Sequence, residues 1–159
     1  MVVKSFRGLI DTGAQETISL HTNDGSTGYR IVKFECLNKN PGTAGVEGVL
    51  KVYTIPQTAI DGVVDFSDNT LLAAAFYENN TSDSTLGAGT IITFDNVTFN
   101  QDIYVTYTDV SGSSQAMNYH IELEMVKLDL NENTVATLKD IRNIEGQPFT
   151  STPWVNNII

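Results

Sequence analysis

The sequence predicts an all-β domain: an antiparallel β-sandwich, with a jelly roll as the preferred topology and a Greek-key sandwich as the second choice. Three observations lead to this prediction. Apolar and polar residues alternate with a period of two along most of the chain, as they do in half-buried strands. Turn residues separate about eight such segments at spacings of roughly 8–12 residues. The 159 residues match one domain, long enough to bury roughly 70% of its unfolded surface.

The clearest alternation lies between Phe94 and Leu128. Two series of alternate apolar residues define its apolar face: Ile103, Val105 and Tyr107, then Tyr119, Ile121, Leu123 and Met125. The segment between the two series, Asp109–Gln115, is rich in Ser and Gly. We therefore predict two antiparallel strands joined as a hairpin with a mobile tip.

The remaining strands follow from the same alternation. In chain order they are predicted at Lys4–Leu9, Glu16–His21, Tyr29–Leu37, Gly48–Ile55 and Thr90–Phe94. The turn at Asn23–Ser26 contains Asp-Gly, a strong hairpin signal. Thr70–Tyr77 holds three alanines, which favour a helix. It is short and flanked by strands, so we predict a fully buried strand there.

The C-terminal part of the chain is less regular. Val135–Arg142 fits either a two-turn helix or an edge strand. Beyond it, glycine and prolines alternate with large apolar residues, so we predict a sandwich domain over 1–145 and an extended apolar arm over 146–159. This arm needs a surface on which to bury its side chains, on its own domain or on a neighbour. The predicted interface residues are Phe149, Trp154, Val155 and Ile158.

Charge and composition exclude several classes of function. The chain has 19 acidic and 9 basic residues, a net charge of −10, so it repels nucleic acid phosphates and suits a basic partner surface. No window approaches 18 apolar residues, so we expect no membrane span. Met1–Lys4 leads directly into a strand pattern without a signal peptide, so we expect synthesis in the cytoplasm. Cys36, the one cysteine, lies in phase with Val32 and Phe34 and is predicted to be a buried structural thiol.

The motif Asp11-Thr12-Gly13 resembles the active-site loop of retroviral-type aspartic proteases, in which two copies bring paired carboxylates together. The context departs from that family: few residues precede Asp11, no glycine-rich flap follows, and Ile144–Gly146 is a poor match to the bracing segment. Asp-Thr-Gly is also an ordinary turn between strands. We favour the turn.

Two carboxylate groups carry weaker signals. Glu122 and Glu124 share a strand face, where solvated charges are commoner than an acid–base pair. The segment around Asp61, Asp65 and Asp68, with Asn69 beside it, offers oxygen ligands for calcium, but its spacing does not match an EF-hand. Aspartate is also common in turns.

The two histidines, His21 and His120, lie on polar strand faces with no second imidazole at ligand spacing. We therefore predict no catalytic residue, no cofactor and no metal. By elimination, the sequence indicates a protein that binds other proteins.

Several stretches together resemble small phage virion proteins, especially of marine phages: the decoration or cement proteins on the outside of the head. They are Lys4–Gly8, Gly28–Phe34, Asp65–Asn69, Phe94–Asn96, Asn100–Val105 and Asn118–Glu124. The resemblance implies a β-sandwich, made in the host cytoplasm, that binds the major capsid protein on the capsid exterior. It also implies a homo-oligomer, with a trimer favoured. We hypothesise that the arm of such an oligomer buries Phe149, Trp154 and Ile158 in a neighbouring subunit.

Two alternatives remain open from the sequence. A receptor- or glycan-binding virion module would also be all-β and non-enzymatic, with its site on loops such as Glu78–Gly89 and Asp109–Gln115. The aspartic protease at Asp11 is the weaker one.

Overall fold

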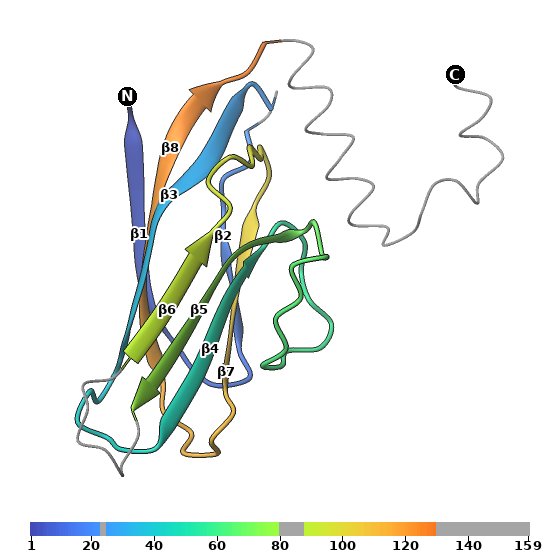
Figure 1. The fold of residues 1–159 in the computed structure, drawn as a ribbon. Helices are drawn as coiled ribbons and strands as arrows, with labels where there is room; N and C mark the ends of the chain where they lie inside the picture. Colours follow the sequence, from blue (N-terminus) through green and yellow to red (C-terminus); the bar gives the residue numbers. More distant parts are fainter. Residues whose placement is uncertain (23–24, 80–87, 130–159) are drawn as a thin grey trace, which may run out of the picture.

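The computed structural model describes residues 1–22, 25–79 and 88–129, which form two antiparallel sheets packed face to face (Figure 1). Within these residues the chain forms eight strands: β1 (Val3–Ile10), β2 (Gln15–Ile18), β3 (Thr27–Asn38), β4 (Val46–Tyr53), β5 (Leu71–Asn79), β6 (Ala88–Thr93), β7 (Ile103–Asp109) and β8 (Met117–Lys127). The smaller sheet has the order β1-β8-β3 and the larger one β2-β7-β4-β5-β6. The predicted all-β sandwich is confirmed.

Strands from the two ends of the chain meet in the sheets. β8 lies between β1 and β3, and β7 lies between β2 and β4, so early strands pair with late ones. Only β4, β5 and β6 follow one another as neighbours; most other connections cross between the sheets. Because β6 pairs with β5, the larger sheet has five strands and the smaller one three. The narrower jelly-roll topology therefore stays a prediction.

The predicted hairpin between β7 and β8 is wrong. β7 pairs with β2 and β4, whereas β8 pairs with β1 and β3 in the other sheet. The hairpin signal at Asp24-Gly25 fails in the same way, since β2 and β3 belong to different sheets. A turn residue marks where a strand ends, but a crossing between two sheets needs the same turn chemistry as a hairpin.

The inner faces of the sheets carry the predicted apolar alternation. Ile103, Val105 and Tyr107 of β7 are completely buried, and so are Ile121 and Leu123 of β8. These side chains meet in one cluster between the sheets, which is where most of the hydrophobic stabilisation arises. The alternation therefore assigned the core-facing side of both strands correctly.

The alanine-rich segment is the strand β5, as predicted, because it pairs with β4 and β6 on its two sides. Tertiary pairing here outweighs the helix propensity of alanine. Ala73 and Ala75 point into the core, whereas Phe76 is 37% exposed. The prediction of full burial is wrong at Phe76.

A β-bulge shifts the register of β3 between Ile31 and Lys33. The bulge moves Val32 out of phase: it is exposed, while Phe34 is buried and Cys36 half-buried. The prediction that Cys36 and Phe34 face the same side of the strand is therefore right. The prediction that Val32 also faces that side is wrong. Burial raises the pKa of the Cys36 thiol to about 11, so the thiol stays protonated near neutral pH.

Candidate functional site

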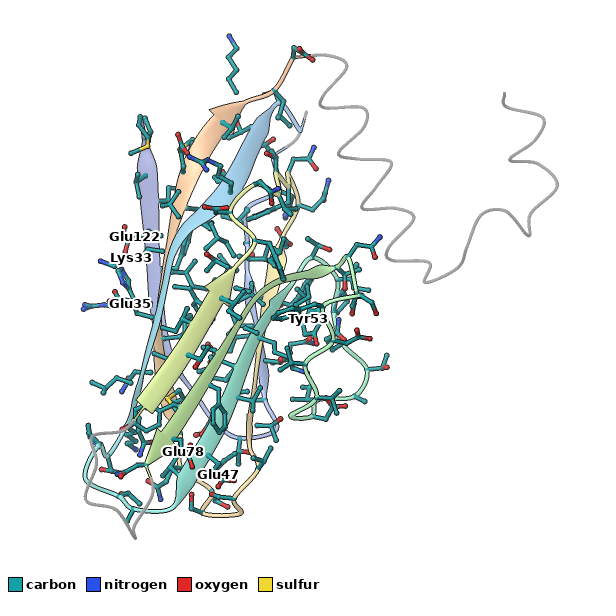
Figure 2. All side chains as sticks on the ribbon, in the orientation of Figure 1. Lys33, Glu35, Glu47, Tyr53, Glu78 and Glu122 are labelled. Carbon is teal, nitrogen blue, oxygen red and sulfur yellow. The ribbon has the colours of Figure 1, made fainter. Side chains whose placement is uncertain are left out.

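A long connection, residues 54–70, covers part of the outer face of the larger sheet. Its two ends are tied together where the Thr54 N–H donates to the Thr70 carbonyl at 2.9 Å. Beneath it lies Lys51, which points outward from β4 and is nevertheless buried. The Lys51 ammonium donates to Asp61 Oδ1 at 3.1 Å and to the Val63 carbonyl. It also lies 5.5 Å from the ring centroid of Tyr53, which Figure 2 shows beside this loop.

This ion pair fixes the loop on the sheet. The hydrogen bond that Lys51 donates to Asp61 lowers the pKa of Asp61, so its carboxylate stays charged at neutral pH. We expect Asp61→Asn to lower the free energy of unfolding by about 1–2 kcal/mol, because the buried ammonium loses its counter-charge. Urea denaturation at pH 7 measures this effect. Asp65→Asn, in the same loop but away from Lys51, is the matched control. Equal midpoints for the Asp61 variant and the native chain would contradict the prediction.

The aspartates of this loop are engaged with the loop itself. Asp65 Oδ1 accepts the Ser67 N–H at 2.9 Å, and Asp68 Oδ1 accepts the Thr70 N–H at 2.9 Å. The described residues contain no group of three or more His, Cys, Asp or Glu side chains placed to hold a metal ion. Asp65 and Asp68 thus make the local hydrogen bonds that are typical of aspartates in turns.

An apolar groove of about 370 Å³ lies beside this loop, on the outer face of the larger sheet. Its apolar lining is Val49, Gly62, Val64, Phe66, Ala74, Phe76, Ile92 and Val110. The small residues Gly62 and Ala74 leave space between larger neighbours, and a Cβ at Gly62 would approach Val110 Cγ1 to 2.4 Å. The loop is thus held tightly against the end of β7.

The large side chains of the groove remain accessible to solvent. Phe66 is 53% exposed, Val110 50% and Val64 43%, while Phe76 and Ile92 are each 37% exposed. The Phe66 ring is held edge-on against Phe94 with centroids 5.2 Å apart. The apolar groove, with the lining given above, draws its residues from five segments of the chain: β4, the loop 54–70, β5, β6 and the end of β7. The one hint in the sequence was that Leu71–Tyr77 is apolar on both faces.

Two carboxylates lie at one end of the apolar groove. Glu47 of β4 and Glu78 of β5 are directly opposite each other in the ladder, and Figure 2 shows both at the lower end of the sheet. Glu47 also lines the groove. Like charges at such cross-strand positions are destabilising. Across the part of the chain that the structure describes, neither carboxylate forms an ion pair.

A second surface lies on the outer face of the smaller sheet, where a broad open hollow of about 1050 Å³ is bordered by all three strands. At its centre His120 Nε2 is 2.8 Å from Ser5 Oγ, and His120 Nδ1 is 3.1 Å from Glu35 Oε1. Arg7 lines the same hollow. Strand pairing brings His120 to Ser5 across 115 residues of sequence, a contact that the sequence did not predict.

Ser5, His120 and Glu35 have the order of a nucleophile, a base and an orienting carboxylate. The surroundings differ from those of a nucleophilic site. β1 and β8 pair along their full facing length, so their N–H groups lie in the plane of the sheet and not toward Ser5 Oγ. The His120 ring is 32% exposed and Glu35 54%, which leaves the charges in water. The hydrogen bond with His120 lowers the pKa of Glu35, and we assign these contacts to cross-strand pairing.

Glu122 and Glu124, the two glutamates that share a strand face, have separate partners. Glu124 forms an ion pair with Arg30 of β3, and Glu122 Oε1 lies 3.9 Å from His120 Nε2. Figure 2 shows Glu122 on the outer side of the smaller sheet, near Lys33 and Glu35. The predicted shared face is correct, and the two carboxylates contact different partners there.

Asp11-Thr12-Gly13 forms the turn that joins β1 to β2 in the opposite sheet. Gly13 has φ +80°, a conformation that suits glycine, and its N–H donates to the Tyr107 carbonyl at 2.8 Å. Thr12 Oγ1 accepts the Asp109 N–H at 2.9 Å, so its hydroxyl contacts β7. Asp11 is exposed. The motif is the turn that we favoured.

His21 contacts the carboxylate of Asp102, the residue directly before β7. Asp102 Oδ1 accepts the N–H groups of Leu20 and His21, at 2.8 and 3.0 Å, and lies 2.8 Å from His21 Nδ1. Burial alone would raise the pKa of Asp102, but these hydrogen bonds outweigh it and the pKa is lowered. This contact holds the end of β2 against the start of β7.

No protein-family model and no curated protein matches this sequence. Among the described residues, no helix has the length and apolar character needed to cross a membrane. The predicted interface residues Phe149, Trp154, Val155 and Ile158 lie outside the described residues.

Proposed function

We propose that this protein is a non-enzymatic structural protein of a phage virion. In this proposal it binds the outer surface of the capsid as a decoration or cement protein and stabilises the head. The observation that carries the proposal is the apolar groove, with five large side chains between 37% and 53% exposed. Exposed apolar surfaces of this kind, with a polar rim, commonly mark protein–protein contacts.

Three further features support a structural role. The sandwich holds the groove on three neighbouring hydrogen-bonded strands, β4, β5 and β6, with β6 at the edge of the sheet. The buried Lys51 fixes the loop that forms one of its walls. The net charge of −10 suits basic partner surfaces and opposes binding to nucleic acid. The partners in this proposal are the major capsid protein and further copies of this chain, with a trimer favoured.

The test is quantitative mass spectrometry of purified virions, counting this protein against the major capsid protein. The proposal expects one copy per capsid subunit, or a simple fraction of that ratio. A handful of copies per particle would favour the receptor-binding alternative, for which the polar hollow around Ser5, Arg7 and His120 would be the first surface to test with glycans. Absence from the particle would refute both virion roles.

A further inference from the structure

We propose that the apolar groove binds the C-terminal segment, residues 146–159, of a neighbouring copy of the same chain. This inference names the occupant of the groove, and it rests on the proposed function, because assembly on a shell places copies side by side. The pairing joins two features of the chain: a groove with exposed apolar walls, and a segment rich in large apolar residues.

The segment complements the groove in chemistry. Its fourteen residues include Phe149, Trp154, Val155 and Ile158 and contain no Asp, Glu, Lys or Arg, in a chain of net charge −10. An uncharged segment can approach this acidic domain without repulsion. Aromatic anchors that fill apolar pockets commonly dominate the energy of an interface.

The length of chain beyond Asp129 lets the segment reach a neighbouring copy. The described chain ends at Asp129, just past β8 in the smaller sheet (Figure 1). The groove lies on the outer face of the opposite sheet. To reach its own groove, the segment would have to pass around an edge of the sandwich. Residues 130–145 can span roughly 53 Å when extended, which is enough to reach a copy packed alongside. Neighbours held on a shell also present the segment at high effective concentration.

The proposal places a charge contact at one end of the apolar groove. Glu47 and Glu78 face each other at the end of the groove, and neither has an ion-pair partner among the described residues. Lys139 and Arg142 lie seven and four residues before the apolar segment, with Asp140 between them and Glu145 after them. A neighbour's Lys139 and Arg142 placed beside these carboxylates would relieve the like-charge repulsion while the apolar residues occupy the groove.

Sedimentation velocity of the full chain tests the proposal. We expect concentration-dependent self-association that deletion of 146–159 abolishes, that Trp154→Ala weakens about 30-fold or more, and that Phe76→Glu weakens to a similar degree. Leu9→Glu is the matched control: Leu9 is an exposed apolar residue on the other sheet, and its variant should associate normally. A full chain that stays monomeric at all concentrations, or association that survives the deletion, would overturn the proposal.

Disulfide trapping tests the contact itself in a Cys36→Ser background. Thr90→Cys lies on the groove in one tagged chain, and Asn156→Cys lies in the segment of a differently tagged chain. Oxidation should give covalent pairs carrying both tags, whereas Thr17→Cys, on the opposite edge of the same sheet, should give none. A chain with both cysteines that forms only an intrachain bond would refute the neighbouring copy.

The charge argument has its own test. Glu78→Lys and Arg142→Glu should each weaken association about 2- to 5-fold, and the two together should restore it. Additive losses would refute the charge pairing. If disulfide trapping gives covalent pairs but the protein is absent from virions, the proposed function alone is refuted. If virions contain the protein at a simple ratio to the major capsid protein but no covalent pairs form, this inference alone is refuted.

Discussion

Replacing Tyr107 by alanine is expected to lower the free energy of unfolding by about 3–5 kcal/mol. Tyr107 is completely buried, and its ring lies where a Cβ at Gly48 would approach it to 2.9 Å. Its hydroxyl donates to the Gln115 carbonyl at 2.7 Å, which ties β7 to the loop that leads into β8. Burial raises the pKa of Tyr107 far above its ordinary value, so the hydroxyl remains a donor at any physiological pH. The alanine variant leaves a cavity and an unpaired carbonyl together.

Tyr107→Phe separates these two contributions. It retains the ring and removes only the hydrogen bond, so we expect a loss of about 1 kcal/mol. Chemical denaturation of the three proteins, followed by fluorescence and circular dichroism, measures both differences. A loss below about 1 kcal/mol for Tyr107→Ala would mean that the core collapses around the missing ring, contrary to this prediction.

Replacing Asp109 by alanine is expected to cost about 2–3 kcal/mol. Its carboxylate organises the connection from β7 to β8, because Oδ1 accepts the Ser111 N–H at 3.0 Å and Oδ2 accepts the Gln115 N–H at 3.1 Å. The hydroxyls of Ser111 and Ser113 also donate to it, each at 2.5 Å. The Ser/Gly-rich segment predicted as a mobile hairpin tip is therefore built around one buried charge.

The contribution of Asp109 should depend on pH. Burial alone would raise the pKa of Asp109, but the hydrogen bonds from Ser111, Ser113 and Gln115 outweigh it and lower the pKa. A lowered pKa in the folded state stabilises the fold above the unfolded pKa of about 3.9, and this stabilisation is lost as pH falls through the folded value. Asp109→Asn should therefore flatten the fall in stability below about pH 4.

Denaturation midpoints measured at intervals from pH 7 to pH 2 check this expectation. Asp102→Asn should flatten the same region, since Asp102 has a lowered pKa for a similar reason. Asp11→Asn, an exposed turn residue, is the control and should follow the native curve. Parallel curves for the native chain and Asp109→Asn would show that Asp109 titrates alike in both states.

Several outcomes show where local pattern suffices. Alternation placed Ile121 and Leu123 in the core because side chains of a strand point to opposite faces, whatever its neighbours are. The turn at Gly13 followed from residue types that tolerate its conformation. Pattern failed at Val32, because a bulge inserts one residue and reverses the phase beyond it, and no residue type marks that insertion.

By itself, the sequence determined the all-β class, most strands and the side of each that faces the core. These properties depend on the spacing of residues within a few positions of one another. Only the tertiary structure decided which sheet each strand joins, because a turn signal does not distinguish a hairpin from a crossing between sheets. For the same reason, only the fold placed His120 beside Ser5 and Glu35, and Phe76 beside Ile92 and Val64 in the apolar groove. Surfaces of this kind are assembled from distant segments, so their composition depends on strand order and not on local pattern.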